Sequence, residues 1–149
     1  MIETKEVIAF FDRLAPGWDA DMVRNDAIIN TILDNAAVTE GKDVLDVACG
    51  TGDLTSLDFA DDCFDVAIAA NVLHLLKDPQ RAVSELVRVT RPGGVIIIPN
   101  YMNQEDTDRR FLRLAGAVGF TVHHEWDTDA FLAFLSSCGL RVEEHRGFD

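Results

Sequence analysis

The stretch Val44-Leu45-Asp46-Val47-Ala48-Cys49-Gly50-Thr51-Gly52 decides the fold. A short apolar run, interrupted by one aspartate, leads directly into a loop that contains two glycines. This pattern is typical of a buried parallel strand that ends where a nucleotide-like ligand lies against the backbone. Glycine suits such a loop because it adopts positive φ and has no Cβ to hold the ligand away. The stretch therefore predicts a parallel sheet with a ligand-binding loop after its first strand.

The composition is that of an ordinary globular domain. The chain has 149 residues, of which 48% are hydrophobic and 26% charged, enough for one domain with a sizeable core. Its formal net charge of −13 argues against a nucleic-acid partner, because phosphates would be repelled from most of the surface. Cys49, Cys63 and Cys138 are odd in number and lack metal-ligand spacing, so we expect reduced thiols and no metal. A start without an apolar signal region, and no membrane-length apolar run, favour a cytoplasmic protein without a membrane span.

Helical and strand patterns alternate along the chain. Helices are expected over residues 3–14, 21–35, 79–90 and 106–118, and from Asp127 or Thr128 onward. Strands are expected over residues 43–48, 64–70, 95–98 and 141–145. Val95–Ile98 is so uniformly apolar that we predict a central, parallel strand there. The alternation predicts a single α/β domain over residues 1–149, with a mostly parallel sheet and helices on both faces.

Three phrases in a fixed order point to a known family. They are Asp46–Gly52, Phe64–His74, and the helix from Pro79 with the turn Arg91-Pro92-Gly93-Gly94 and its strand. Together they resemble class I S-adenosylmethionine-dependent methyltransferases of the type 11 or quinone-biosynthesis group, and Phe10–Asp19 resembles the N-terminal segment of that group. A Gly-x-Gly loop is also found in dinucleotide-binding proteins, whose fingerprint has a third glycine three positions later. Thr55 stands there instead, which disfavours a nicotinamide-dependent oxidoreductase.

The resemblance implies a Rossmann-like fold that binds S-adenosylmethionine and releases S-adenosylhomocysteine. The cofactor-binding residues that it implies are Trp18, Asp46, Ala48, Cys49, Gly50, Thr51, Gly52, Asp53, Asn71 and Val72. In this interpretation Asp46 orients the glycine loop, and Asn71 faces the sulfonium, which an amide oxygen attracts without competing as a nucleophile. Simpler alternatives remain open: Asp46 is a strand-end carboxylate bound by backbone amides, Asn71 is a turn residue, and Trp18 packs a helix onto the sheet.

The middle of the family pattern is missing. In the family a helix and a second strand follow the glycine loop, and that strand ends in an acidic residue that binds the ribose. Here the strand from Phe64 arrives almost at once, so part of the sheet is lacking. Asp53 either continues the glycine loop or begins a phrase, Asp53–Phe59, that resembles the family segment whose aspartate meets the adenine amine. Either a stretch of the natural protein is left out of this sequence, which the intact flanks favour, or the chain is a shortened relative with an incomplete site.

Methyl transfer from a sulfonium is an in-line displacement, so the protein mainly aligns the acceptor and excludes water. A base is needed only where the acceptor loses a proton. His74 is our first candidate and Tyr101 the second; His123 and His124 are weaker, and each is more simply a packing or surface residue.

We divide the chain into an N-terminal helical cap (1–38), a cofactor-binding core (39–101) and a variable segment with a final helix and strand (102–149). The cap and the variable segment would select a small, partly apolar acceptor, and the protein would be a monomer or homodimer. A non-catalytic module of the same fold, acting through protein interactions, is the alternative function.

Overall fold

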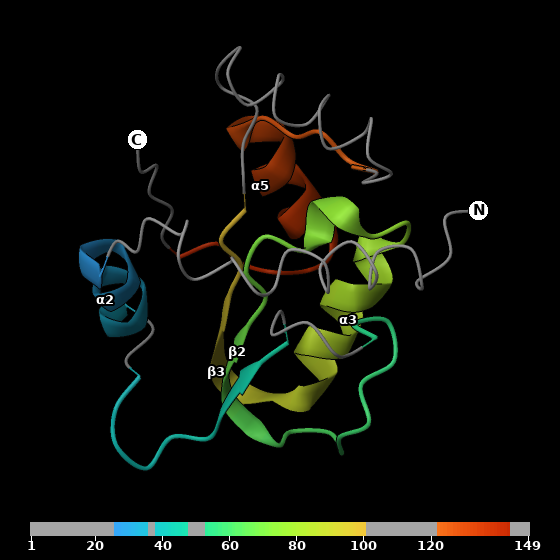
Figure 1. Ribbon diagram of the computed structural model, residues 1–149. Coiled ribbons are helices and arrows are strands. Elements are labelled where there is room, and N and C mark those ends of the chain that lie inside the picture. The colour runs from blue at the N-terminus through green and yellow to red at the C-terminus, as the bar shows by residue number, and fades with distance from the viewer. Residues whose placement is uncertain (1–25, 36–37, 48–52, 101–121, 144–149) are drawn as a thin grey trace, which may run out of the picture.

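A computed structural model of the protein describes residues 26–35, 38–47, 53–100 and 122–143 (Figure 1). The described elements are, in order, α2 (Asp26–Asn35), β1 (Val44–Asp46), β2 (Phe64–Ile68), the 3-10 turn η1 (Leu73–Leu75), α3 (Pro79–Val89), β3 (Thr90–Ile97) and α5 (Thr128–Ser137). Strands alternate with helices as expected, which confirms the α/β class. The helices expected over residues 3–14 and 106–118 lie outside the described residues.

The three described strands form one parallel sheet in the order β1-β2-β3. Val44 of β1 lies opposite Val66 of β2, and Ala67 of β2 lies opposite Ile96 of β3. Both β2 residues are buried, as expected of a strand that is hydrogen-bonded on both sides and covered on both faces. The parallel arrangement predicted from the apolar strand patterns is confirmed.

The central position expected for Val95–Ile98 stays a prediction. Among the described strands β2 is central and β3 is an edge strand, with Val95 36% exposed. The final strand expected from Arg141 is not formed over residues 141–143, which are exposed and outside any helix or strand. The outer edge of β3 therefore has no strand beside it among the described residues.

The junction of α3 and β3 also differs from the expectation. The helix ends at Val89, and the strand already begins at Thr90, which lies opposite Phe64. Two residues further along β2, Val66 lies opposite Val95, so Arg91–Gly94 bulge out of the ladder. A Cβ on Gly94 would lie 2.7 Å from the Asp65 carbonyl oxygen, and the bulge therefore requires glycine at this close approach.

Helices α3 and α5 both begin at the residues that the sequence indicates. The Asp78 carboxylate accepts a hydrogen bond from the Arg81 backbone N–H (3.0 Å), and Pro79 occupies the first helical position. The Asp127 carboxylate likewise accepts from the Ala130 N–H (2.8 Å), so Asp127 rather than Thr128 caps α5. The N-caps satisfy backbone donors that the helix itself leaves unpaired.

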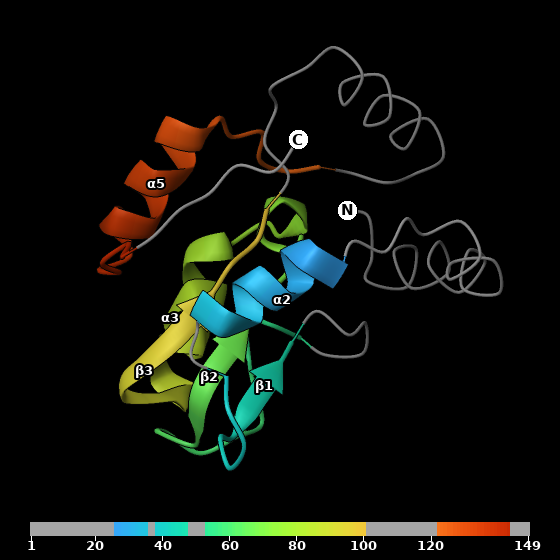
Figure 2. The same cartoon turned by 90° about the vertical axis from the view of Figure 1, so that its left-hand side faces the viewer.

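The core forms where the apolar side of α3 covers the sheet. Its members are shared by the sheet, α3, η1 and α5, and include Val47, Ala67, Ala69, Leu73, Ala82, Val83, Leu86, Phe131 and Leu135. Figures 1 and 2 show α3 on one face of the sheet and α2 on the other, as expected for a sheet covered on both sides. Phe131 and Leu135 bring α5 to the same core, next to the segment that follows β2.

Leu86 provides the direct test of this packing. Its side chain is fully buried between α3 and the sheet, so Leu86→Ala should lower the free energy of unfolding by about 2–5 kcal/mol. Val87, the next residue, is 44% exposed, and Val87→Ala should change that free energy by less than about 0.5 kcal/mol. Urea unfolding of both variants measures the difference; equal effects would contradict the packing described.

Candidate cofactor and active site

The carboxyl ends of the three strands meet at one edge of the sheet, where the arrowheads in Figure 2 point. Backbone hydrogen bonds continue the pairing beyond the strands themselves. Ala69 N–H donates to the Ile97 carbonyl (2.9 Å), and Asn71 N–H donates to the Pro99 carbonyl (2.8 Å). Open parallel sheets bind ligands outside this edge, so the predicted site residues emerge where a ligand is expected.

Part of the predicted site lies outside the described residues. This part comprises Trp18, Tyr101 and the loop residues Ala48, Cys49, Gly50, Thr51 and Gly52. The remaining predicted residues, Asp46, Asp53, Asn71, Val72 and His74, all follow β1 or β2 or end them. Asp46 is the last residue of β1 and is exposed at the edge.

Asn71 has an unusual backbone. Its φ of +52° lies in the left-handed region, which asparagine tolerates better than most residues, and its side chain is exposed. Residues held in such a conformation concentrate at ligand sites and turns. Val72, which follows it, is half-buried and packs against the core, and its carbonyl accepts from the Leu75 N–H that closes η1. Asn71 therefore presents a polar side chain on a turn that Val72 anchors.

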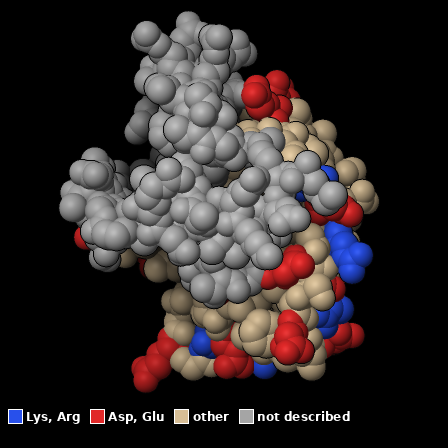
Figure 3. All heavy atoms as spheres, turned by 45° about the vertical axis from the view of Figure 1, so that its right-hand side comes forward, with Lys and Arg blue, Asp and Glu red and all other residues tan. Residues whose placement is uncertain are grey.

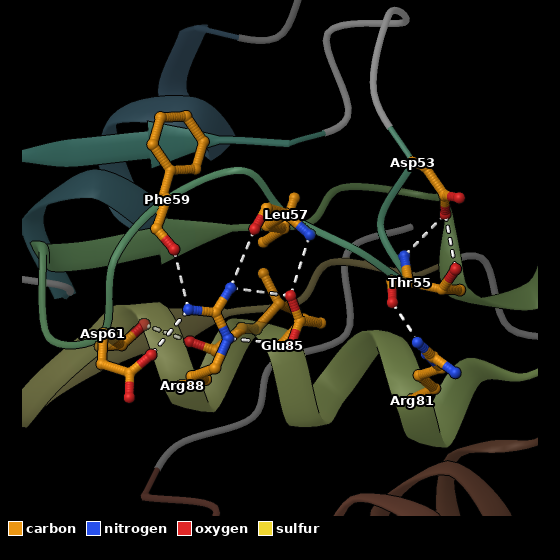
Figure 4. Close-up of polar contacts among 10 residues, drawn as sticks. Asp53, Thr55, Leu57, Phe59, Asp61, Arg81, Glu85 and Arg88 are labelled. Carbon is orange, nitrogen blue, oxygen red and sulfur yellow. Dashed lines mark hydrogen bonds and ion pairs between the residues drawn. The ribbon is translucent and has the colours of Figure 1, made fainter.

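Asp53 begins the described segment between β1 and β2. One of its carboxylate oxygens, Oδ1, accepts hydrogen bonds from the backbone N–H (2.9 Å) and the hydroxyl (2.6 Å) of Thr55 (Figure 4). These bonds lower the pKa of Asp53 below its ordinary value, so the side chain is ionised at neutral pH. Asp53 is thus a fixed, exposed carboxylate directly after the glycine loop.

The rest of that segment is attached to α3 by one arginine. The Arg88 guanidinium donates to the carbonyls of Leu57 (2.9 Å) and Phe59 (2.8 Å) and to the carboxylates of Asp61 (2.7 Å) and Glu85 (2.8 Å), as Figure 4 shows. Arg88 and the Leu57 N–H together lower the pKa of Glu85 to about 2. The ion-pair group holds an irregular segment of the chain on the helix surface.

His74 lies at the centre of the site edge. It is 8% exposed, and its Nδ1 lies 2.9 Å from Oδ1 of Asn100, the residue that follows Pro99 beyond β3. Because that oxygen only accepts, Nδ1 carries the proton and Nε2 is the unprotonated nitrogen. The His74 carbonyl accepts from the backbone N–H groups of His123 (2.9 Å) and His124 (3.1 Å). His74 therefore joins three segments: those after β2, after β3 and before α5.

Asn100 is a site residue that sequence reasoning missed. It occupies, beyond β3, the place that Asn71 occupies beyond β2, and the equivalence was visible in the phrase Ile98-Pro99-Asn100 at the end of an apolar strand. Two asparagines and the buried His74 thus stand at adjacent strand ends.

The segment before α5 contributes aromatic packing. The rings of His124 and Trp126 stack with centroids 4.9 Å apart, and Trp126 also contacts Phe131 (5.2 Å) and Phe134 (5.0 Å). Trp126 and Phe134 pack against the core, so these rings contribute to the packing of α5 and the segment before it. No group of three metal-ligating side chains occurs among the described residues, His123 and His124 included.

A second polar group lies at the opposite, amino ends of the strands. Arg91 binds the carboxylates of Asp43 and Asp65, both at 2.9 Å, and Lys42 lies 3.9 Å from Asp65. Lys42 and Asp65, with the Arg91–Gly94 bulge, line a hollow. Acidic and basic side chains are interspersed on the described surface in Figure 3. Since its charges are paired with one another, we interpret this group as a structural link between strand starts.

His74 gives a pH test of the site. Burial lowers the pKa of His74 below its ordinary value of about 6.5, although the bond to Asn100 opposes this. As the pH falls below 6.5 the unfolded chain takes up a proton that the folded protein still excludes, so stability is lost. The melting temperature of the native protein should fall more between about pH 7.5 and pH 5 than that of His74→Gln, which cannot titrate. If the melting temperatures of the two proteins fall equally over this pH range, His74 is not shielded from protonation.

Comparison with known proteins shows which family this chain matches. A methyltransferase-domain family model matches residues 21–98, just over half of the chain. Demethylmenaquinone methyltransferase of Renibacterium salmoninarum is 28% identical, over 64% of this chain and 59% of the relative. That alignment is 142 positions long but includes only 64% of the 149 residues of this chain. Many of its positions therefore pair a residue of the relative with a gap in this sequence. The Cereibacter sphaeroides phosphatidylethanolamine N-methyltransferase is 38% identical over 36% of this chain and 26% of the relative.

Solved structures agree on the fold. The [4+2]-cyclase SpnF superposes with a TM-score of 0.70 at 18% identity, covering 89% of this chain and 70% of SpnF. A chain from the complex of the Haloferax volcanii Trm112 methyltransferase activator with a methyltransferase gives 0.69 at 18% identity, covering 94% and 77%.

The chain spans less than two thirds of the length of the curated relatives that it matches. The family match nevertheless covers α2, all three described strands and α3, and the site residues lie at the carboxyl edge of that sheet. The protein belongs to the class I, S-adenosylmethionine-dependent methyltransferase family.

Proposed function

We propose that this protein transfers the methyl group of S-adenosylmethionine to a small, partly apolar acceptor. The observation that carries the proposal is the carboxyl edge of β1 and β2, where Asp46 and Asn71 are exposed, together with the exposed Asp53, which follows the predicted glycine loop in the sequence. The match of a methyltransferase-domain model over residues 21–98 supports it.

The side chains at this edge suit the chemistry of the cofactor. S-Adenosylmethionine supplies a methyl group already activated by its sulfonium, so the protein needs to bind and align rather than activate. Carboxylates such as Asp46 and Asp53 accept hydrogen bonds from hydroxyl and amine groups of a nucleoside or amino acid. The amide oxygen of Asn71 attracts a positive sulfonium. We assign the loop residues Ala48–Gly52, with Val72 and Trp18, to the same cofactor site on the family resemblance.

His74 is our first candidate for a general base where the acceptor must lose a proton. Its Nε2 is unprotonated, and Asn100 fixes the ring through Nδ1. A pKa below the ordinary value keeps the imidazole neutral, which a base requires. Tyr101, just beyond Asn100 in the chain, is the second candidate.

The acceptor is assigned only by chemical class. The relatives include proteins named for demethylmenaquinone and for phosphatidylethanolamine, a quinone and a phospholipid. Both names support an acceptor with an apolar part. A quinone is favoured because the demethylmenaquinone methyltransferase aligns over more of this chain than the phosphatidylethanolamine N-methyltransferase does. Every helix among the described residues is too short or too polar to span a bilayer. A cytoplasmic location, a monomeric or homodimeric state and the absence of a nucleic-acid partner stay predictions.

A non-catalytic module of the same fold is the second candidate. The observation that favours it is the described part of the connection between β1 and β2, residues 53–63, which contains neither the helix nor the strand expected to carry the ribose-binding acid. The cyclase SpnF also has this fold, so the fold does not by itself fix the reaction.

Calorimetry with S-adenosylhomocysteine separates the two candidates. We expect saturable binding by the native protein and a raised melting temperature, since a ligand at 100 times its Kd adds about 2.7 kcal/mol to the free energy of unfolding. NADH serves as the control and should produce neither effect. Absence of heat and of any thermal shift with S-adenosylhomocysteine would contradict cofactor binding; binding without methyl transfer to quinol acceptors would favour the non-catalytic module.

Asn71→Gly tests the sulfonium contact. Glycine keeps the positive φ of this residue at little cost and removes only the side chain. The variant should bind S-adenosylmethionine about tenfold or more weakly, because a hydrogen-bonding or charge contact with an ion is lost. Its affinity for S-adenosylhomocysteine, which has no positive sulfur, should stay within about threefold. Equal losses for both ligands would assign Asn71 to the turn alone.

A further inference from the structure

We propose that Arg81 of α3 is a positioning residue, which holds the Asp53 carboxylate in place for the cofactor through the backbone of Thr55. The inference rests on the proposed function, in that it takes Asp53 as a cofactor contact. It adds a residue on a different element, 28 positions along the chain, to which no sequence motif pointed.

The first step is the turn that begins at Asp53. Its Oδ1 accepts from both the N–H and the hydroxyl of Thr55, and its carbonyl accepts from the Ser56 N–H at 3.1 Å. Thr55 thereby determines where the carboxylate points. In Figure 4 the second oxygen, Oδ2, points away from Thr55, and no hydrogen bond to it occurs among the described residues. That oxygen is available to accept from a ligand.

The second step is the contact that fixes Thr55 itself. The Arg81 Nε donates to the Thr55 carbonyl oxygen at 2.9 Å (Figure 4), so both polar ends of the Thr55 backbone are held. On the inner side of the turn, Leu54 is 4% exposed and anchors the segment in the core. With these contacts Asp53 has little freedom to rotate away from the end of the glycine loop.

The third step is the pattern on the helix. Arg81, Glu85 and Arg88 are four and then three residues apart, so they follow one another along a single side of α3. Glu85 accepts from the Leu57 N–H, and Arg88 binds the carbonyls of Leu57 and Phe59. Arg88 therefore holds the far part of the segment, whereas Arg81 holds the end next to the cofactor site. The two arginines should have separable effects.

A double-mutant cycle on S-adenosylhomocysteine binding tests the inference. Arg81→Ala should weaken binding of this ligand about three- to tenfold, the range of one hydrogen bond, because Asp53 is no longer held in its binding orientation. Asp53→Asn keeps an oxygen for Thr55 but replaces the other acceptor with a donor, and should weaken binding at least as much. The double variant should be no weaker than Asp53→Asn, since Arg81 acts only through Asp53.

Matched variants distinguish a positioning role of Arg81 from an effect on folding and from an effect of its charge. Gln80→Ala, the exposed neighbour on the same helix, should leave both affinity and melting temperature unchanged. Arg81→Lys keeps the charge without the rigid guanidinium geometry and should restore only part of the affinity. Arg88→Ala should lower the melting temperature markedly, whereas Arg81→Ala should shift it by no more than about 2 °C.

Each failure has a distinct signature. Losses that add in the double variant, or unchanged affinity in Arg81→Ala while Asp53→Asn is weakened, would overturn the role of Arg81 and leave the proposed function intact. Unchanged affinity in Asp53→Asn would remove Asp53 from the site and the inference with it. No binding of S-adenosylhomocysteine by the native protein would overturn both the proposed function and the inference.

Discussion

The guanidinium of Arg88 supplies hydrogen bonds to the described connection between β1 and β2, residues 53–63, which contains no helix. Parallel neighbours are usually joined by a crossover helix, which satisfies its own backbone hydrogen bonds. Here the described part of the connection, from Asp53 to Cys63, contains neither helix nor strand, so its carbonyls need partners from elsewhere. Arg88 supplies donors to two of them and to two carboxylates, and the carbonyls of Arg88 and Val89 accept from Asp62 and Cys63. The connection is thereby held against α3.

The same helix links the core to the site. Its buried side, with Ala82, Val83 and Leu86, fixes the sheet from one face, while its polar side holds the segment that starts at Asp53. The position of α3 on the sheet therefore also sets the position of a carboxylate at the ligand edge. The proposed cofactor site would therefore depend on the packing of a helix that contributes no proposed ligand contact.

The segments that follow the carboxyl ends of β2 and β3 are joined by His74. A buried imidazole bonded to Asn100, with its carbonyl accepting two N–H groups from the segment before α5, connects what the sequence separates by 26 to 50 residues. His74 thus links Asn100 with the segment before α5. The reaction at such an edge is decided by the chemistry of the site and not by the fold, which the cyclase SpnF shares.

The sequence by itself determined the local elements, because caps and apolar spacing act over a few residues: Asp78 with Pro79 begins α3, and Asp127 begins α5, where their patterns predict. The phrase ending at Gly52 and the strand from Phe64 likewise predicted parallel strands, with Asn71 at the carboxyl end of the second. Only the tertiary structure decided the order β1-β2-β3 of the described strands, the absence of a strand over residues 141–143, and the partners of Arg81, Arg88 and Asn100. Those outcomes depend on which distant segments pack together, and apolar periodicity specifies that a face is buried without specifying what covers it.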